Sequence, residues 1–175
     1  GRIEWLDARD VIEVEWAALG PNVRWSESGG NAERVVRIAP PVTLIIPGFV
    51  ARDRNGVQTT LGRNGSDFSA SIFAHLLDAA EIHIWTDVDG VLSADPRLVP
   101  DATIIESLSY HEAMELAYFG AKVIHPQTMA PAVVKSIPIR IRNTFAPDRA
   151  GTLICGRPAS NYLVKGITSI DRVGL

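Results

Sequence analysis

Short runs of β-branched residues alternate along the chain with segments of helical periodicity, and this alternation restricts the possible folds more than any other feature. Val42–Ile46 and Ile82–Trp85 are compact apolar runs that indicate strands. Residues 137–141 alternate isoleucine with proline or arginine, which indicates a half-buried strand. Apolar residues also recur on one helical face over residues 66–77. Strands that alternate with helices predict an α/β layered fold with a largely parallel sheet.

The first part of the chain predicts a mixture of strands and turns. Residues 1–19 favour a short strand or two, and the segment 20–31 is rich in Gly, Ser, Pro and Asn, which favours a surface loop. A short helix is expected over 32–39. The continuous apolar character of Val42–Ile46 predicts a strand buried on both faces. Asn55-Gly56 predicts a hairpin with a two-residue loop.

Three helices are expected farther along the chain. The first begins near Ser66 or Asp67 and runs to about residue 77. Ser109 with Glu112 three residues later forms a capping box, so a second helix starts there and ends at Gly120. A third begins in its first turn with Pro126, and a further proline at 131 shortens or kinks it.

Composition excludes several classes of protein. A net charge of −3 and a pI near 5.8 lack the basic character of nucleic-acid-binding proteins. The longest apolar stretch, 42–50, is interrupted by Pro47 and Gly48 and is too short to span a membrane. The single cysteine, Cys155, allows no internal disulfide; with no secretory leader in view, this predicts a cytoplasmic protein. The four histidines lack metal-ligand spacing, so no residue is assigned as a metal ligand.

A glycine-rich loop, residues 62–67, leads directly into the first of these helices. Its two glycines let the backbone approach a ligand closely, and the free N–H groups of a helix start favour an anion. Arg63 adds a guanidinium fork suited to a carboxylate or phosphate. The alternative is purely structural: Ser66 or Asp67 serves as an N-cap and the glycines only shape a turn.

Two further loops could carry chemistry. Thr86-Asp87-Val88-Asp89-Gly90 follows a strand, with Asp95-Pro96-Arg97 shortly after, so acidic groups and an arginine could meet a nucleotide or hydrated Mg²⁺. Asp-Gly and Asp-Pro are equally ordinary turn formers. Lys122, just past a helix end, could contact a phosphate or only neutralise the helix C-terminus. His125, three residues on, is typical of a capping residue rather than a catalyst.

Together, several blocks resemble the aspartate kinase family of the amino-acid kinase fold. Their order and spacing extend over roughly residues 42–155, which makes the resemblance specific. The blocks are Pro47-Gly48-Phe49, Leu61–Asp67, Trp85–Val91, Asp95–Arg97, the run from Ser109 through Glu112 and Phe119 to Pro126, Arg142-Asn143-Thr144, and Gly151–Ile154.

The resemblance implies a three-layer α/β/α sandwich with a mostly parallel sheet, present here in part. It implies transfer of the ATP γ-phosphoryl group, with Mg²⁺, to the side-chain carboxylate of L-aspartate. The product is 4-phospho-L-aspartate, used in lysine, threonine and methionine biosynthesis. Phosphoryl transfer mainly requires alignment and neutralisation of spreading negative charge, which arginine, lysine, Mg²⁺ and helix N-termini supply.

Residue roles also follow from the resemblance. Arg63, which would pair with the aspartate carboxylate, and Asp67, which would orient the phosphate-binding lysine, are the expected catalytic-site residues. The expected substrate-binding residues are Arg63, Asn64, Gly65 and Ser66. The nucleotide-binding set is Thr86, Asp87, Leu92, Arg97, Lys122 and Val123, with Leu92 standing where many relatives carry Tyr.

The same resemblance predicts how the chain is divided. Residues 1–155 would be the C-terminal, nucleotide-binding part of the kinase domain. Residues 156–175 would be a linker and the first strand of an ACT regulatory domain, because Tyr162–Thr168 resembles the entry into such domains. Asn64, where many relatives have Gly, resembles the bifunctional aspartokinase–homoserine dehydrogenase subgroup.

The chain lacks the Lys-Phe-Gly-Gly loop with which the family begins. We therefore expect a fragment, inactive alone, of a longer protein that forms a homo-oligomer. Two alternatives stay open. One is another acyl-phosphate-forming amino-acid kinase, such as a glutamate or acetylglutamate kinase. The other is a non-catalytic nucleotide-binding subunit with a regulatory or assembly role.

Overall fold

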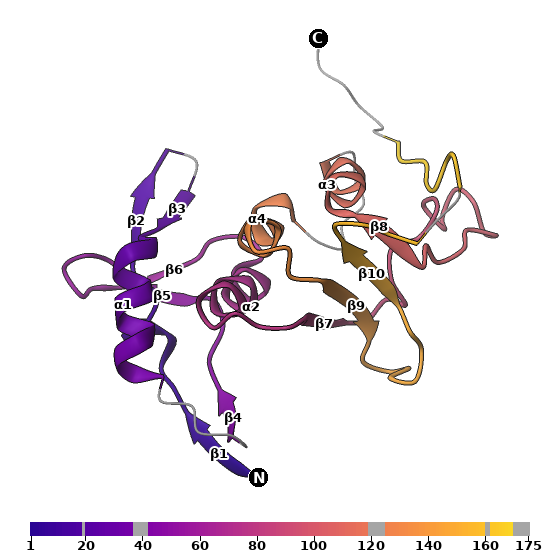
Figure 1. Ribbon diagram of the computed structural model, residues 1–175. Coiled ribbons are helices and arrows are strands. Elements are labelled where there is room, and N and C mark those ends of the chain that lie inside the picture. The colour runs from indigo at the N-terminus through magenta and orange to yellow at the C-terminus, as the bar shows by residue number, and fades with distance from the viewer. Residues whose placement is uncertain (19, 37–41, 119–124, 160–161, 170–175) are drawn as a thin grey trace. The chain divides into compact units, whose positions relative to one another are not determined.

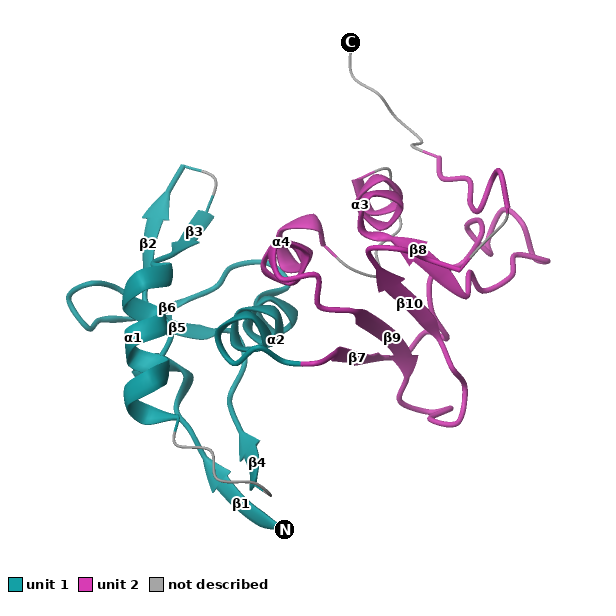
Figure 2. Cartoon of the chain, in the orientation of Figure 1, with its two compact units in different colours: residues 1–79 teal, residues 80–175 magenta. Residues whose placement is uncertain are grey.

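A computed structural model describes residues 1–18, 20–36, 42–118, 125–159 and 162–169 (Figure 1). The chain forms two compact units, residues 1–79 and 80–175 (Figure 2). This division falls inside the predicted 1–155 domain, whose boundary at residue 155 stays a prediction. No helix in the described ranges is long and apolar enough to cross a membrane.

The described residues of the first unit form three strand pairs and two α-helices. β1 (Arg2–Trp5) pairs in parallel with β4 (Val42–Ile45), as expected for strands separated by a crossover. Two antiparallel pairs accompany them, β2 (Val14–Ala17) with β3 (Gly20–Val23) and β5 (Val50–Arg52) with β6 (Gln58–Thr60). A 3₁₀ turn (Ala8–Asp10) and the helices α1 (Trp25–Val35) and α2 (Gly65–Leu76) complete the unit. Its buried core is Ala8, Val11, Ile12, Val14, Ala32, Ala51, Leu61, Phe68, Ile72 and Phe73.

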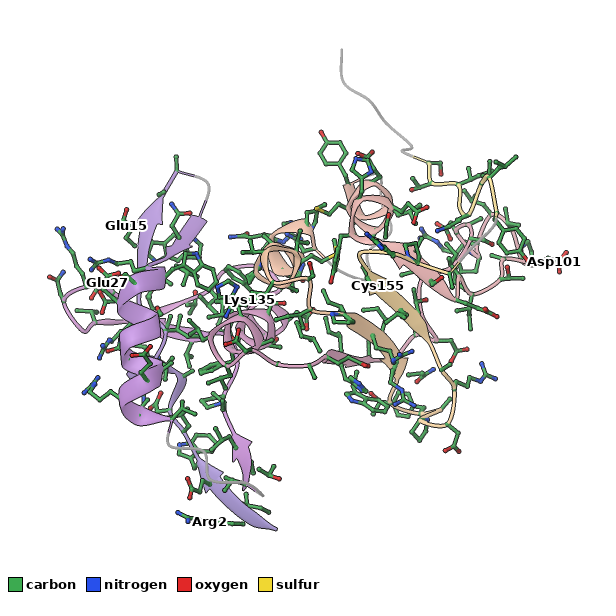
Figure 3. All side chains as sticks on the ribbon, in the orientation of Figure 1. Arg2, Glu15, Glu27, Asp101, Lys135 and Cys155 are labelled. Atoms are coloured by element: carbon green, nitrogen blue, oxygen red, sulfur yellow. The ribbon has the colours of Figure 1, made fainter. Side chains whose placement is uncertain are left out.

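The predicted surface loop over 20–31 is wrong, because this segment forms β3 and most of α1; the helix expected over 32–39 accordingly starts at Trp25. The polar residues of α1 are used in tertiary contacts. Ser28 is fully buried and its hydroxyl accepts a hydrogen bond from the Glu13 N–H at 3.0 Å. Asn31 donates to the Val11 carbonyl at 3.2 Å, whereas Glu27 lies at the surface (Figure 3). Composition alone could not reveal that these polar groups have partners inside the unit.

Two strand predictions also need correction. β4 is present as predicted, but its residues alternate between partly buried and exposed instead of being buried on both faces. The reason is that β4 pairs with β1 and with no other described strand. The hairpin at Asn55-Gly56 exists, but its loop spans residues 53–57, because the Asp53 carboxylate accepts hydrogen bonds from the N–H groups of Asn55 and Val57, both at 2.8 Å.

The second unit contains a four-stranded sheet in the order β7-β9-β10-β8. These strands are β7 (Ile82–Thr86), β8 (Ser107–Ser109), β9 (Ile139–Asn143) and β10 (Thr152–Cys155). β7 runs parallel to β9 and β8 parallel to β10, whereas β9 and β10 are antiparallel. The carboxyl ends of β7 and β9 therefore meet, with Thr86 beside Asn143.

The helices of this unit are α3 (Tyr110–Tyr118) and α4 (Pro126–Val134), and α3 packs against α4, β8 and β10 (Figure 1). The predicted capping box is confirmed: the Ser109 N–H donates to the Glu112 carboxylate at 2.6 Å, and the Glu112 N–H donates to the Ser109 hydroxyl at 3.1 Å. His125 caps α4 as expected, accepting from the Gln127 N–H through Nδ1. The predicted helix end at Gly120 lies outside the described residues.

Candidate active site

The loop of residues 62–67 joins β6 to α2 in a conformation that few residues adopt. Gly62 has φ 73° and Asn64 has φ 53°, so two of its backbone positions are left-handed. Asn64 is the N-cap of α2 and its side chain makes no capping hydrogen bond. The structural alternative, in which Ser66 or Asp67 is the cap, is therefore wrong: both lie in the first turn. The helix start presents N–H groups without a side-chain cap, an arrangement that favours an anion.

Arg63 and Asp67 both belong to this loop and differ in burial. Arg63 is exposed, and no described residue forms an ion pair with it. Asp67 is half-buried, and desolvation by burial raises the pKa of its carboxyl group. The loop thus combines a solvent-facing guanidinium, helix N–H groups and a partly desolvated carboxyl group.

A second turn, Pro47-Gly48-Phe49, packs against the start of α2. Phe49 is left-handed, with φ 75°, which is rare for a bulky residue. Its N–H donates to the Ser69 hydroxyl at 2.8 Å. A Cβ on Gly65 would lie 2.6 Å from Cδ2 of Phe49, and one on Gly48 would lie 3.0 Å from Cα of Ser66. The two segments touch so closely that a side chain on Gly65 would clash with Phe49 and one on Gly48 would press against Ser66.

In the second unit, Thr86 and Asp87 follow β7 at the edge where β7 and β9 end. The Thr86 hydroxyl donates to the Asp87 carboxylate at 3.2 Å, and the Thr144 N–H donates to the Thr86 carbonyl at 2.8 Å. Asp87 is exposed. The structure therefore places both predicted nucleotide residues at the carboxyl edge of the sheet, where α/β proteins bind ligands.

Several residues at this edge received no predicted role. Asn143 donates to the Asp89 carboxylate at 2.7 Å, and the Arg149 guanidinium pairs with the same carboxylate. Arg142 lies over the Trp85 ring, 4.8 Å from its centroid, which is cation–π geometry. The available signal was the position of Arg142-Asn143-Thr144 at the carboxyl end of a predicted strand, which the structure shows as β9, parallel to β7.

Leu92 and Arg97 lie in the segment between β7 and β8. Leu92 forms an isolated antiparallel bridge with Ile104. Arg97 is mostly exposed and donates to the Asp95 carboxylate through both its backbone N–H and its guanidinium. Asp95 therefore acts as a turn former and as an anion partner of Arg97 in this structure.

The remaining predicted nucleotide residues, Lys122 and Val123, lie outside the described residues. Residues 63–67 lie together at the start of α2 in the first unit, whereas in the second unit Thr86 and Asp87 lie at the end of β7, and Leu92 and Arg97 contact Ile104 and Asp95. Within the described ranges, no group of three or more His, Cys, Asp or Glu side chains could hold a metal ion.

The family model described as the Amino acid kinase family matches residues 27–143. The chloroplastic bifunctional aspartokinase/homoserine dehydrogenase 1 of Zea mays is 43% identical over 177 residues, which cover 98% of this chain and 19% of that protein. The bifunctional aspartokinase/homoserine dehydrogenase of Haemophilus influenzae is 50% identical over 139 residues, which cover 79% of this chain and 17% of that protein. Lysine-sensitive aspartokinase 3 of Escherichia coli is 35% identical, covering 94% and 39%.

Solved structures give the same result. Aspartokinase III of Escherichia coli, in complex with aspartate and ADP, has a TM-score of 0.81 and 35% identity, covering 91% of this chain and 36% of that chain. Aspartate kinase of Clostridium acetobutylicum has a TM-score of 0.82 and 34% identity, covering 94% and 37%. The predicted α/β class and amino-acid kinase fold are confirmed. The chain spans about a fifth of the bifunctional relatives and less than two fifths of the monofunctional ones.

Proposed function

The chain belongs to the amino acid kinase family, and on that premise we propose that it is the nucleotide-binding part of an aspartate kinase. The complete enzyme would transfer the γ-phosphoryl group of MgATP to the side-chain carboxylate of L-aspartate. The observation that carries the proposal is the likeness, over 91% of the chain, to an aspartokinase solved with aspartate and ADP. The identity of 40% or more to several bifunctional aspartokinase/homoserine dehydrogenases favours membership of that subgroup.

The loop of residues 62–67 would bind the amino-acid substrate. Its uncapped helix start and the exposed Arg63 both favour a carboxylate, which Arg63 would engage through its fork of N–H donors. Asn64, Gly65 and Ser66 would contribute the surrounding backbone and side-chain groups. Asp67, whose carboxyl group is partly desolvated, would orient the ammonium group of a phosphate-binding lysine.

The nucleotide would lie against the second unit. Thr86 and Asp87 stand at the carboxyl edge of the sheet, which supports a role in nucleotide binding. Leu92 would pack beside the nucleotide, and Arg97 would exchange its Asp95 partner for phosphate oxygens. Lys122 and Val123 complete the proposed set.

The reaction conserves charge and atoms in a single displacement. A side-chain carboxylate oxygen of aspartate bonds to the γ-phosphorus, and the bond from that phosphorus to the β–γ bridging oxygen breaks. ADP leaves with that electron pair, and 4-phospho-L-aspartate is the other product. The protein's contribution is alignment of the two substrates and neutralisation of charge that spreads over the phosphoryl oxygens.

The test is a coupled assay of ADP release by the complete kinase that contains this chain. We expect turnover with aspartate and not with glutamate or acetylglutamate. Arg63→Ala should raise KM for aspartate by about a hundredfold, because a charge-assisted bidentate contact is lost. Arg54→Ala removes an exposed arginine from the β5–β6 loop and should leave KM unchanged. A preference for acetylglutamate, or no turnover of any amino acid, would contradict the proposal and favour the other kinases or a non-catalytic subunit.

A further inference from the structure

Ser69 joins the two segments that surround the start of α2. Ser69 is 4% exposed. The hydroxyl accepts a hydrogen bond from the Phe49 N–H at 2.8 Å and donates one to the Gly65 carbonyl, also at 2.8 Å. A single buried hydroxyl therefore connects the Pro47-Gly48-Phe49 turn to the first residue of the helix.

The connection matters because Phe49 is in a conformation that its own side chain disfavours. A left-handed backbone at a bulky residue persists only where its surroundings enforce it. Here both backbone polar groups of Phe49 are engaged: its N–H by Ser69, and its carbonyl by the Leu61 N–H at 2.8 Å. Removal of the Ser69 hydroxyl would release the first of these restraints and leave the Phe49 N–H without its acceptor.

Movement of this turn would be transmitted directly to the loop proposed to bind aspartate. The Phe49 ring lies 2.6 Å from where a Cβ of Gly65 would be, and a Cβ on Gly48 would lie 3.0 Å from both Cα and Cβ of Ser66. These close approaches put the turn in direct contact with the first residues of α2, although Phe49 itself is 45% exposed. The positions of Gly65 and Ser66 are therefore set by where the turn is held.

We propose that Ser69 is a positioning residue for the amino-acid substrate: its hydroxyl holds the Pro47-Gly48-Phe49 turn against Gly65 and Ser66, and thereby fixes the N–H groups at the start of α2. The inference rests on the proposed function, because it assigns those N–H groups to aspartate. Ser69 itself is buried beneath them and does not touch the substrate.

The same helix supplies a matched control. Ser71, two residues farther along α2, is fully buried, and its hydroxyl finds no hydrogen-bond partner among the described residues. Ser69→Ala and Ser71→Ala remove the same atom from the same helix, but only the first breaks a connection between the two segments. Ser69→Thr keeps the hydroxyl and tests rescue.

The experiment measures steady-state kinetics of the complete kinase with aspartate and ATP varied separately. For Ser69→Ala we expect KM for aspartate to rise about tenfold, the effect of one lost buried hydrogen bond, with KM for ATP nearly unchanged. Ser69→Thr should recover most of the loss, and Ser71→Ala should match the wild-type enzyme. An unchanged KM for aspartate in Ser69→Ala, or an equal rise in Ser71→Ala, would overturn the inference.

A second measurement separates this inference from the proposed function. Hydrogen exchange at the Phe49 amide should accelerate in Ser69→Ala and not in Ser71→Ala. If the wild-type kinase turns over no aspartate, the function and the substrate role of Ser69 both fail, whatever the exchange data show. If it does turn over aspartate, and Ser69→Ala speeds exchange at Phe49 without changing KM for aspartate, only the positioning role fails.

Discussion

At the scale of single residues, Asp67 is a candidate site residue whose carboxyl group is partly removed from solvent. Its carboxyl group is half-buried in the first turn of α2, and burial raises its pKa. A buried carboxylate destabilises the folded state unless a cation or hydrogen-bond donors compensate it. Among the described residues none donates to it, which is consistent with a partner that arrives with the substrates or from another part of the kinase.

Asp67→Asn should therefore separate catalysis from stability. In the complete kinase, kcat should fall by about a hundredfold or more, as when a preorganised electrostatic contact is lost. Stability should be equal or higher near neutral pH, because a desolvated charge is removed. Steady-state kinetics and urea denaturation over a pH series measure the two effects. Asp10→Asn, at an exposed aspartate of the same unit, is the control.

Burial of Asp67 makes the stability of the folded state depend on pH in one direction. The folded state binds the Asp67 proton more readily than the unfolded chain, so the stability linked to Asp67 is fully present below the usual aspartate pKa. It is lost as pH rises through the raised value. The difference between Asp67→Asn and the wild type should thus appear toward neutral pH and vanish in acid. An unchanged kcat in Asp67→Asn would show that Asp67 has no role in catalysis.

At the scale of helices and strands, glycines divide into those that the packing requires and those that it does not. Gly151 precedes β10 with φ 69°, and a Cβ there would lie 1.9 Å from the Ile141 carbonyl oxygen of β9. Gly30 lies inside α1 with nothing within 4 Å of its Cβ position. Substitution by alanine should therefore lower the stability of the protein at Gly151 and raise it at Gly30.

Gly151→Ala should destabilise the chain by about 2 kcal/mol or more, because strain at a left-handed position adds to a backbone clash. Gly30→Ala should stabilise it by about 0.5–1 kcal/mol, since alanine is the better helix former. Thermal and urea denaturation of both variants measure these changes. A stable Gly151→Ala protein would show that the β9–β10 turn relaxes without difficulty.

An ion pair joins the segment of residues 162–169 to α3. The Lys165 ammonium contacts the Glu112 carboxylate at 2.9 Å, and Glu112 also accepts the capping hydrogen bond from Ser109. Burial alone pushes the pKa of Glu112 upward, but hydrogen bonds from Lys165 and Ser109 outweigh it and lower the pKa overall. The ion pair borders a cavity of about 290 Å³ between α3 and this segment.

Lys165→Met should lower the free energy of unfolding near neutral pH by about 1 kcal/mol. The value is modest because Glu112 is partly exposed to solvent. The pKa of Glu112 is lower in the folded state than in the unfolded chain. Its contribution to stability is therefore present above the usual glutamate pKa and is lost as pH falls through the lowered pKa of the folded state. The variant and the wild type should therefore converge in acid. Urea denaturation at several pH values measures this, with Arg157→Met as an exposed control in the same unit. A deficit that persists in acid would mean that packing of the lysine stem, not its charge, holds the segment.

The sequence predicted well those elements whose defining patterns lie within a few neighbouring residues. The helical face of α2, the apolar run of β7 and the Ser109–Glu112 capping box each depend on residues within a few positions of one another. The first part of α1, residues 25–31, was missed because its polar side chains pair with distant partners such as Glu13 and Val11. The Asn64 cap was missed because Ser66 and Asp67, two common capping residues, follow it closely, and Asn64 caps through a left-handed backbone rather than through its side chain.

At the scale of the whole molecule, the chain covers only part of the kinases it resembles. It spans 36% of the aspartokinase III solved with aspartate and ADP. Local patterns could identify the residues of each proposed subsite, but neither unit alone carries both. Catalysis requires the two substrates to meet within about 3.5 Å, which neither unit can arrange by itself.

Because the chain spans only 36% of the aspartokinase III solved with aspartate and ADP, we expect the isolated residues 1–175 to bind ATP weakly or not at all and to release no ADP in the coupled assay. The complete kinase, assayed in parallel, is the positive control. Isothermal titration calorimetry with MgATP measures the binding. Robust turnover by the isolated chain would contradict this expectation and show that these residues suffice for both substrates.

The contact of Arg142 with Trp85 has a practical consequence. Three of the four tryptophans, at positions 5, 16 and 25, belong to the first unit, so Trp85 is the sole indole of residues 80–175. It directly precedes Thr86 and carries a guanidinium on its face. With the other three replaced by phenylalanine, its fluorescence would report optically on occupancy of the sheet edge, without any added label.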